Sequence, residues 1–374
     1  MDRRDFVSGA AAGAAGAALA GCGPSTEGGG EAANVQPQQN VRWNLASSFP
    51  QSLDTIFDAA NILAERVKQL TGGRFQIQTY QAGELFPAFE VLSNVQAGAV
   101  EMGHSASYYF KGKDPALIFD CTVPFGLTAR QYNAWVYDGG GMELLRELFA
   151  KFNVRNLPGG NTGIQMGGWF RNPIQGLEGL QGLRMRIPGF GGEVMSKLGV
   201  NVQNLSGGEI YPALERGAID AVEWVGPYDD QKLGFQEIVK NYYYPGWWEP
   251  GPALTFYVNQ SAWESLPQTY QHALEAAAAE ANVRTLARYD ARNPQALKEL
   301  VDAGVKLRRF PDEIMRRAET ATEDLLRSQS SGALYDKIYE SYRDWRQTEQ
   351  RWFATAEQAF ANYAYQDMQL SNPG

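Results

Sequence analysis

The chain has 374 residues, of which 33 are basic and 42 are acidic, so it carries a net charge of −9. This acidic balance excludes nucleic acid as a partner, because binding to a phosphate backbone needs a basic surface. The length that follows the N-terminal leader suffices for two α/β domains of ordinary size.

The N-terminal segment indicates export. Two adjacent arginines precede an apolar, Ala/Gly-rich run at 6–20, and the sequence Leu-Ala-Gly-Cys ends at Cys22. We predict a twin-arginine signal with a lipoprotein cleavage box at 1–22, since the apolar run is shorter than the roughly 20 residues that span a bilayer. The polar segment 23–40 is predicted to be a flexible tether. The mature protein is therefore expected in the periplasm, lipid-anchored if Cys22 is the cleavage site, and Cys121 then lacks a disulfide partner and is expected in the core.

The first half of the mature chain alternates predicted strands and helices. A strand at 41–49 comes first, and a third strand begins at Glu101 and ends at Tyr108 and Tyr109. The βαβ rhythm predicts a parallel sheet with helical crossovers. Side chains at the carboxyl ends of such strands face the ligand crevice, so Tyr108 or Tyr109 is a candidate to contact a ligand. The intervening helices are predicted at 53–70 and 86–97, and the second strand at 74–80.

The pattern of the second half predicts another sheet and then mostly helices. Aromatic and β-branched segments at 242–248 and 254–259 predict strands that recross between the two sheets. Nearly everything after Ser261 is predicted to be helical. The other strands of the second sheet are predicted at 162–172, 183–188, 200–205 and 218–226, and the helices at 268–303, 311–329 and 334–365.

The segment from Leu183 to Asp230 predicts an anion site. Arg186 ends an alternating strand, a Pro-Gly pair stops that strand, and two further glycines let the backbone turn into a helix. A carboxylate here could meet both the guanidinium group of Arg186 and the free N–H groups of the helix. The alternative is that Arg186 forms an internal ion pair, for example with Glu193 or Asp220.

An aromatic stripe runs along the predicted C-terminal helix, at 333–367. So much apolar surface needs a cover, which either its own half of the protein or a partner subunit could provide. Both arrangements are compatible with the sequence. The stripe consists of Tyr335, Ile338, Tyr339, Tyr342, Trp345, Trp352, Phe353, Phe360, Tyr363 and Tyr365.

Four sequence blocks resemble one family of transport proteins. They are VKQLTGGRFQIQTYQAGEL, NVQAGAVEMGHSA, GLRMRIPGFGGEVMSKLG and LERGAIDAVEW, in this order. Together they are similar to the extracytoplasmic solute-binding proteins of tripartite ATP-independent periplasmic (TRAP) transporters, from Val41 to about Tyr365. The resemblance implies a two-lobed α/β periplasmic-binding-protein fold with a hinge and a central cleft. It also implies that the protein closes on a small organic anion, grips its carboxylate with Arg186 and delivers it to membrane permease subunits.

The same resemblance implies a division of the chain into two lobes. Lobe I is expected at 41–161 plus 250–295, and lobe II at 162–249 plus 296–332. The long C-terminal helix follows at 333–367.

The residues around Glu223 are similar to one subgroup of this family. Dicarboxylate and sialic-acid binders usually have an Asn-Pro pair after this glutamate, whereas here it is followed by Trp224, Val225, Gly226 and Pro227. With Gln165 upstream and Trp247-Trp248-Glu249 downstream, the variant resembles the subgroup that binds 2-oxo or 2-hydroxy monocarboxylates together with a metal ion. That subgroup also has a long C-terminal helix that swaps between two subunits, which implies a homodimer.

Two acidic residues beside the anion site favour a bound cation. Glu223 ends a predicted strand and Glu249 lies at a strand-to-loop corner, so both are expected to face the same crevice as Arg186. Two carboxylates would repel an anion in a partly desolvated cleft, and a cation between them reverses that sign. Oxygen ligands from Glu223, Glu249, Gln165 and a backbone carbonyl near Trp224 suit Na⁺ or Ca²⁺, with a mild preference for Ca²⁺. From the residues alone, Glu223 could instead be a surface carboxylate or the partner of an arginine.

The predicted ligand site combines this cation with apolar side chains that line the rest of the pocket. The ligand would chelate the ion held by Gln165, Glu223 and Glu249, and Phe49, Tyr108 and Trp224 are candidate wall residues, because a small ligand needs apolar surroundings with few polar contacts. The competing interpretations are a metal-independent binder of a dicarboxylate or larger acidic ligand, and an enzyme that acts on a small oxo acid. Because the chain lacks HExxH, Gly-x-Ser-x-Gly and P-loop motifs, we predict a binding protein that is not an enzyme.

Overall fold

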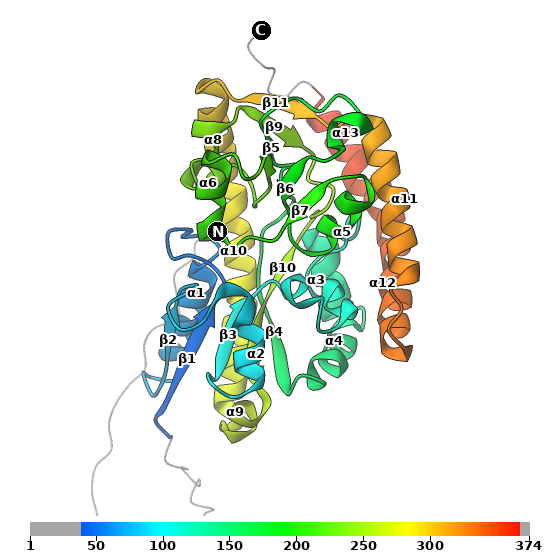
Figure 1. The fold of residues 1–374 in the computed structure, drawn as a ribbon. Coiled ribbons are helices and arrows are strands. Elements are labelled where there is room, and N and C mark those ends of the chain that lie inside the picture. Colours follow the sequence, from blue (N-terminus) through cyan, green and yellow to red (C-terminus); the bar gives the residue numbers. More distant parts are fainter. Residues whose placement is uncertain (1–38, 367–374) are drawn as a thin grey trace, which may run out of the picture. The chain divides into compact units, whose positions relative to one another are not determined.

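Two β-sheets with helices packed around them organise the residues that the structure describes, 39–366 (Figure 1). The structure is a computed structural model of the chain. The predicted signal at 1–22, with Cys22, and nearly all of the predicted tether at 23–40 lie outside the described residues. Within 39–366, no helix combines the length and the apolar character that crossing a membrane requires.

The first sheet is mixed and has five strands. In order across the sheet they are β2 (Phe75–Tyr80), β1 (Val41–Ser47), β3 (Met102–Ser105), β10 (Ala253–Asn259) and β4 (Val154–Asn161). β1 pairs in parallel with β2 and β3, as the βαβ rhythm predicts, whereas β10 comes from the second half of the chain and pairs antiparallel with β3 and β4. The return of β10 into this sheet confirms the predicted recrossing of the chain.

The second sheet is also mixed and has six strands. In order they are β11 (Lys306–Arg309), β9 (Asn241–Tyr244), β5 (Trp169–Phe170), β8 (Ala221–Val222), β6 (Arg184–Arg186) and β7 (Asn201–Gln203). β6 pairs in parallel with β7 and β8, while β5 pairs antiparallel with β8 and β9. The mixed α/β class and the two sheets are confirmed, and the lobe boundaries themselves stay a prediction.

Two details of the second sheet differ from the sequence prediction. The segment 162–172 was expected to be one strand, but only β5 is extended and paired, because Gly163 and Gly168 have φ angles of +70° and +77° and turn the backbone. The N–H groups of Gln165 and Met166 then bind carbonyl groups of other loops rather than a ladder. β11 was not predicted, since the four residues of this strand are mostly basic and give no hydrophobic signal.

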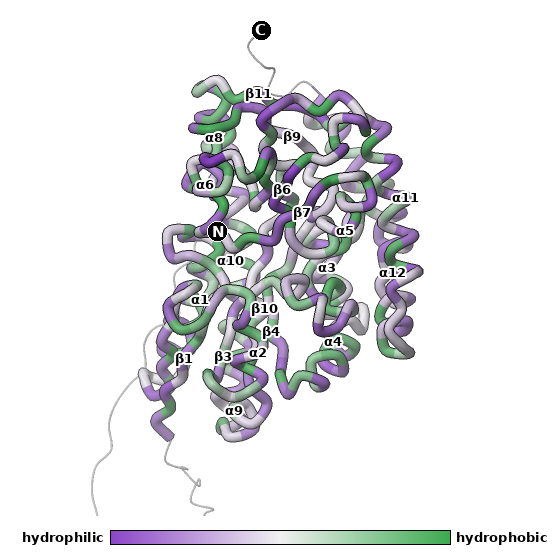
Figure 2. Tube along the Cα trace, viewed as in Figure 1, coloured by the Kyte–Doolittle hydropathy of each residue, from purple (hydrophilic) through white to green (hydrophobic). Residues whose placement is uncertain are grey.

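Helices surround the sheets and connect their strands. Hydrophobic and hydrophilic residues alternate along α11 (Asp312–Ser328) and the following helix α12 (Ala333–Phe353), as expected for helices with one buried face (Figure 2). The short 3₁₀ helix η2 (Ser107–Phe110) follows β3 directly and carries both candidate tyrosines. The helices before the C-terminal one are α1 (Asp58–Leu70), α2 (Val91–Gln96), α3 (Ala129–Tyr137), α4 (Gly141–Ala150), α5 (Gly189–Lys197), α6 (Gly207–Glu215), α7 (Pro227–Lys232), α8 (Phe235–Ile238), α9 (Gln260–Ser265), α10 (Gln268–Asp302) and α11 (Asp312–Ser328).

The long C-terminal helix is confirmed, with one irregular turn. α12 (Ala333–Phe353) continues through a π-helical segment (Ala354–Gln358) into α13 (Ala359–Ala364). The first half of the aromatic stripe packs within the protein: the rings of Tyr335 and Tyr342 both lie 5.4 Å from that of Phe119. The second half is open, since Trp352, Phe360, Tyr363 and Tyr365 are between 57% and 78% exposed.

Candidate functional site

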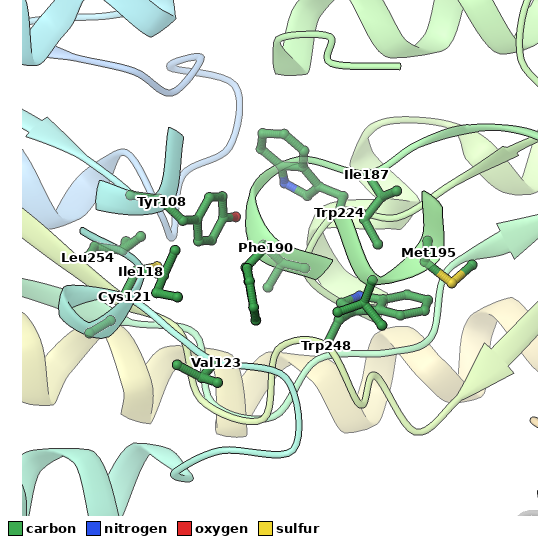
Figure 3. Packing of buried hydrophobic residues seen from close by; sticks show 14 of the residues in the cluster. Tyr108, Ile118, Cys121, Val123, Ile187, Phe190, Met195, Trp224, Trp248 and Leu254 are labelled. Carbon is green, nitrogen blue, oxygen red and sulfur yellow. The ribbon is translucent and has the colours of Figure 1, made fainter. Parts of the chain in front are cut away.

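A small closed pocket lies between the two sheets. The cavity volume of this pocket is about 20 Å³. Tyr108, at the end of β3, and Trp224, just after β8, lie on opposite sides of this region, and the Tyr108 hydroxyl points across it (Figure 3). From the first sheet and its loops the lining includes Phe49, Ile56, Ala106, Tyr108 and Leu254, and from the second Gln165, Arg186, Trp224 and Val225.

Among the residues that the structure describes, Arg186 is the only cation in the lining of this pocket, and it is 1% exposed. Strand β6 ends at this residue, so its side chain reaches the crevice between the sheets. Its Nε donates to the Leu205 carbonyl at 3.0 Å, and its Nη1 donates to the Glu223 carbonyl at 2.8 Å and to the Glu223 carboxylate. The guanidinium carbon lies 4.9 Å from the centre of the Trp224 ring. Within residues 39–366 its Nη2 atom has no hydrogen-bond partner, so one arm of the buried guanidinium group is available to an anion.

The two glutamates predicted to hold a cation stand beside the pocket lining. Glu223 and Glu249 are 1% and 3% exposed. Burial raises the pKa of the Glu223 carboxyl well above its usual range, although Arg186 opposes this change. Burial likewise raises the pKa of Glu249 to about 7, against the opposing effects of Tyr108, Arg186 and Gln165. The Oε2 atom of Glu249 has no hydrogen-bond partner. Without a cation, burial thus favours the neutral forms of these two carboxyl groups, and a cation bound between them would favour the charged forms.

Gln165 is positioned by the backbone of the loop that carries Glu249. Its N–H donates to the Glu249 carbonyl at 3.2 Å, and its carbonyl accepts from Gly246 at 3.0 Å. The side-chain Nε2 donates to Thr162 at 3.3 Å, while the Oε1 atom is buried without a partner. A free amide oxygen and a free carboxylate oxygen, close to a second buried carboxylate, are the donor set that Na⁺ or Ca²⁺ accepts. The residues therefore fit the predicted cation, although within 39–366 no group of three or more His, Cys, Asp or Glu side chains is arranged as a metal centre.

The predicted wall residues also meet at this pocket. Phe49 and Tyr108 are buried on the first-sheet side, and Trp224 is buried on the second. A Cβ atom built on Gly207 would lie 2.9 Å from the Trp224 ring, so only glycine allows this close approach. Tyr109 lines the pocket as well, and burial raises the pKa of its hydroxyl to about 12 although Arg186 lies nearby.

Sequence reasoning missed the aliphatic part of the lining. Ile56 and Leu254 belong to segments that carried no polar signal, since one lies before α1 and the other within β10. Thr162, which holds the Gln165 amide, was also missed, although its place three residues before Gln165 could have indicated it.

The start of helix α5 does not join this pocket. The sequence suggested that its N–H groups and Arg186 would bind one carboxylate together. Pro188, Gly189 and Gly192 instead line a separate, more open hollow of about 290 Å³, next to the Lys111–Glu193 ion pair. The alternative interpretation of Arg186 as a member of an internal ion pair is confirmed, but its partner is Glu223, which is thereby also the predicted partner of an arginine. Of the two examples considered, Glu193 pairs with Lys111 and Asp220 pairs with Arg184 at 2.7 Å.

A buried polar site between two β-sheets is typical of binding proteins that enclose a small solute. Comparison with known proteins gives the family. The chain belongs to the bacterial extracellular solute-binding proteins of family 7, the DctP family of TRAP solute-binding proteins, whose family model matches residues 46–332. Proteins of this family are periplasmic and serve transport together with TRAP membrane components.

Three relatives show what similar chains bind. A monocarboxylate 2-oxoacid-binding periplasmic protein of Nostoc sp. (strain PCC 7120) is 48% identical over 97% of this chain and 99% of its own length. A TRAP solute-binding protein of Bordetella bronchiseptica RB50 (47% identity, TM-score 0.86, 88% of this chain and 98% of that one) is a mixed-occupancy dimer, with copurified calcium and picolinate in the bound active site. One from Pseudoalteromonas atlantica T6c (41% identity, TM-score 0.84, 87% of this chain and 99% of that one) contains sodium and pyruvate.

Proposed function

We propose that this TRAP solute-binding protein captures a small 2-oxo or 2-hydroxy carboxylate as a chelate with Ca²⁺ or Na⁺ and delivers it to the membrane permease. One observation carries the proposal: buried Arg186, with one unpartnered arm, and Gln165, with an unpartnered amide oxygen, line the same pocket, and Glu249, which also has an unpartnered oxygen, is buried next to Gln165. The relatives that bind pyruvate or picolinate with sodium or calcium support it.

The charges around the pocket explain why anion and cation bind together. Glu223 and Glu249 outnumber Arg186, so an anion alone would meet net repulsion in a site with few water molecules. The cation would supply positive charge that holds the ligand's carboxylate and 2-oxygen. Glu223, Glu249, Gln165 and a backbone carbonyl near Trp224 would hold the ion, and the free Nη2 of Arg186 would donate to the ligand carboxylate.

Capture also needs the pocket to open, since its arginine is 1% exposed. We propose that lobe I (41–161 plus 250–295) and lobe II (162–249 plus 296–332) separate by a hinge motion. Two ion pairs would connect these lobes in the closed form, Lys111 with Glu193 and Asp54 with Lys232. Both are partly exposed, so each contributes little on its own and they can break when the lobes open.

Two further parts of the proposal concern export, through the N-terminal segment, and dimer formation, through the C-terminal helix. We propose export by the twin-arginine signal at 1–22, an anchor at Cys22 with the tether at 23–40, and a homodimer through the C-terminal helix at 333–367. The exposed aromatic side chains at 352–365 support the dimer, as does the dimeric relative from Bordetella bronchiseptica. A solution mass equal to one chain at micromolar concentration would contradict a stable dimer.

Titration calorimetry tests the ligand and the cation together. Pyruvate, lactate and longer 2-oxo acids are titrated into the metal-stripped protein in EDTA, in Na⁺ and in Ca²⁺. We expect binding in the presence of a cation and much weaker binding in EDTA. Equal affinity in all three conditions would favour the metal-independent binder of a dicarboxylate or larger acid. We propose that the protein does not transform its ligand, so turnover of any of these acids would favour the enzyme instead.

A further inference from the structure

A buried aspartate stands behind the cation side of the pocket. Asp230 lies on α7 and is 1% exposed, yet no cation pairs with it among the described residues. Its Oδ2 atom accepts from the Trp169 indole at 2.9 Å and from the Tyr242 hydroxyl at 2.6 Å. Its Oδ1 atom accepts from the backbone N–H of Val225 at 3.3 Å. One carboxylate therefore connects strand β5, strand β9 and the loop that follows β8.

This carboxylate fixes the segment that carries Glu223 and Trp224. Val225 lines the pocket, and its N–H group is held by Asp230. The carbonyl of the same residue accepts from the N–H of Met166 at 3.2 Å, and Met166 is the neighbour of Gln165. The Asp230 contact thus sets how far Glu223 stands from Gln165, although Asp230 does not line the pocket itself.

The two aromatic donors make this support rigid. The Trp169 and Tyr242 rings stack with their centres 4.0 Å apart and both are fully buried. A buried aromatic ring that also donates a hydrogen bond has little freedom to move, so the carboxylate it holds is fixed as well. Groups that orient metal ligands from behind typically affect metal affinity by roughly 10–100-fold when removed.

The charge of Asp230 also acts on the site. Asp230 is close enough to Glu223 that its negative charge adds to that of Glu249 in disfavouring ionisation of Glu223. A divalent ion favours the charged forms of buried carboxyl groups more strongly than a monovalent ion does, so a further carboxylate near Glu223 and Glu249 increases the preference of the site for Ca²⁺.

We propose that Asp230 is a positioning residue for the cation: it fixes the Glu223–Val225 segment against Gln165, and its charge makes the site prefer Ca²⁺ to Na⁺. This inference rests on the proposed function. Beyond that function, it assigns the preference for Ca²⁺ over Na⁺ to Asp230, a residue that does not line the pocket.

Calorimetry on Asp230→Asn tests both parts. The asparagine keeps the size of the side chain but removes its charge and places an amide N–H₂ against one of the three donors. With pyruvate as the probe in Ca²⁺, we expect the affinity to fall by roughly 10–100-fold. In Na⁺ we expect a smaller loss, so that the ratio of the two affinities moves towards Na⁺. Titration of calcium chloride without pyruvate should show weaker Ca²⁺ binding, and calcium should raise the melting temperature of the variant less than that of the wild type.

Two further variants distinguish the effect of the hydrogen bonds that position Asp230 from the effect of its charge. Trp169→Phe combined with Tyr242→Phe removes two donors and keeps the Asp230 carboxyl group. These two hydrogen bonds lower the pKa of Asp230, which burial raises to about 6, so the affinities are measured at pH 8 to keep its charge. We expect a smaller loss of affinity and an unchanged ratio between the ions. Asp120→Asn, which removes a carboxylate of similar burial that is hydrogen-bonded to Thr255 of the first sheet, should leave both affinities unchanged.

Several results would overturn the inference. One is a folded Asp230→Asn protein that binds pyruvate like the wild type in both ions, and another is the same loss in Ca²⁺, Na⁺ and EDTA. If Asp230→Asn does not fold, wild-type affinity in the Trp169/Tyr242 double variant contradicts the positioning role by itself. The proposed function fails separately, if wild-type binding of pyruvate is independent of any cation.

Discussion

The two sides of the pocket differ in chemistry. The second sheet and its loops contribute Arg186, Gln165 and, next to the lining, Glu223 and Glu249. The first sheet and its loops contribute mainly apolar atoms, and no basic residue from this side is among the lining residues.

This difference indicates a division of tasks. The charged side would bind the carboxylate and its cation, and the apolar side would cover the rest of the ligand and exclude water. A second carboxylate on the ligand would find no cation on the first-sheet side, which disfavours dicarboxylates. We therefore expect substitutions on the charged side to change the affinity for every ligand, and substitutions on the apolar side to change the preference among ligands.

The largest expected effect is the loss of the arginine. Arg186→Ala should lower the affinity for pyruvate by about 100-fold or more, because truncating one partner of a buried charge pair costs about 2–5 kcal/mol. Arg184→Ala is the matched control, since Arg184 is on the same strand but is exposed and pairs with Asp220 at 2.7 Å. Calorimetry in Ca²⁺ measures both. A nearly unchanged affinity of a folded Arg186→Ala protein would mean that the carboxylate binds elsewhere.

Next in size is the cation dependence, which Glu249 should control. Glu249→Gln keeps the shape of the side chain but removes the charge of a carboxylate whose Oε2 atom has no hydrogen-bond partner among the described residues. The affinity for pyruvate in Ca²⁺ should therefore fall by roughly 10–100-fold. The remaining binding should respond little to EDTA. Glu193→Gln makes the same chemical change in the outer hollow and should keep the full EDTA response. A Glu249→Gln protein that loses binding in EDTA as strongly as the wild type would exclude Glu249 as a ligand of the ion.

A smaller effect is expected on the apolar side. Ile56→Ala enlarges the first-sheet wall, so the affinity ratio of a longer 2-oxo acid to pyruvate should rise, by about tenfold, since one methylene group in a pocket is worth about 1–3 kcal/mol. Ile62→Ala removes the same atoms from a buried position in α1 within the core of the first sheet, and should change stability but not the ratio. Equal ratios in the two variants would show that Ile56 does not contact the ligand tail.

The charged side was largely predictable from the sequence, and the apolar side was not. Arg186 and Glu223 were singled out at the ends of predicted strands, and Gln165 and Glu249 through the resemblance to the family subgroup. In the structure Arg186 and Gln165 line the pocket and contact the two glutamates. Their binding of the ligand stays a prediction. Aliphatic residues such as Ile56 are common everywhere in a core, so only the fold identifies those that face the pocket.

Backbone details were the other limit of sequence reasoning. The expected strand at 162–172 and the expected role of the α5 N-terminus both depended on glycine-rich segments, where the φ angle is not fixed by residue type. Gly189, with φ of +66°, turns the start of α5 against the Tyr108 ring and so directs it to the outer hollow. Such turns depend on contacts with distant residues, which local patterns do not contain.

The smallest expected effect separates stability from binding within the first sheet. Burial raises the pKa of Asp120 to about 7, although hydrogen bonds from Ser107 and Thr255 oppose this. An acid whose pKa is raised by folding stabilises the protein at low pH, and this contribution is lost as the pH rises from its ordinary value of 3.8 through about 7. His104 acts in the opposite direction, since burial lowers its pKa to about 4, and its contribution is lost as the pH falls from 6.5 towards that value.

The pH profile of the melting temperature distinguishes these two groups. Between pH 6.5 and 8 the Asp120 contribution changes and that of His104 does not, so Asp120→Asn should flatten the decline of the wild-type melting temperature in this range by a few degrees. Part of the decline should remain in this variant, because burial also raises the pKa of Glu249 and of Asp229 to about 7. His104→Gln should change the profile below pH 6.5 instead. Both proteins should bind pyruvate in Ca²⁺ as the wild type does, because neither side chain lines the pocket. A parallel shift of the whole profile in Asp120→Asn would mean that this carboxyl does not titrate in the range, and a weakened affinity would mean that the first sheet does more than cover the ligand.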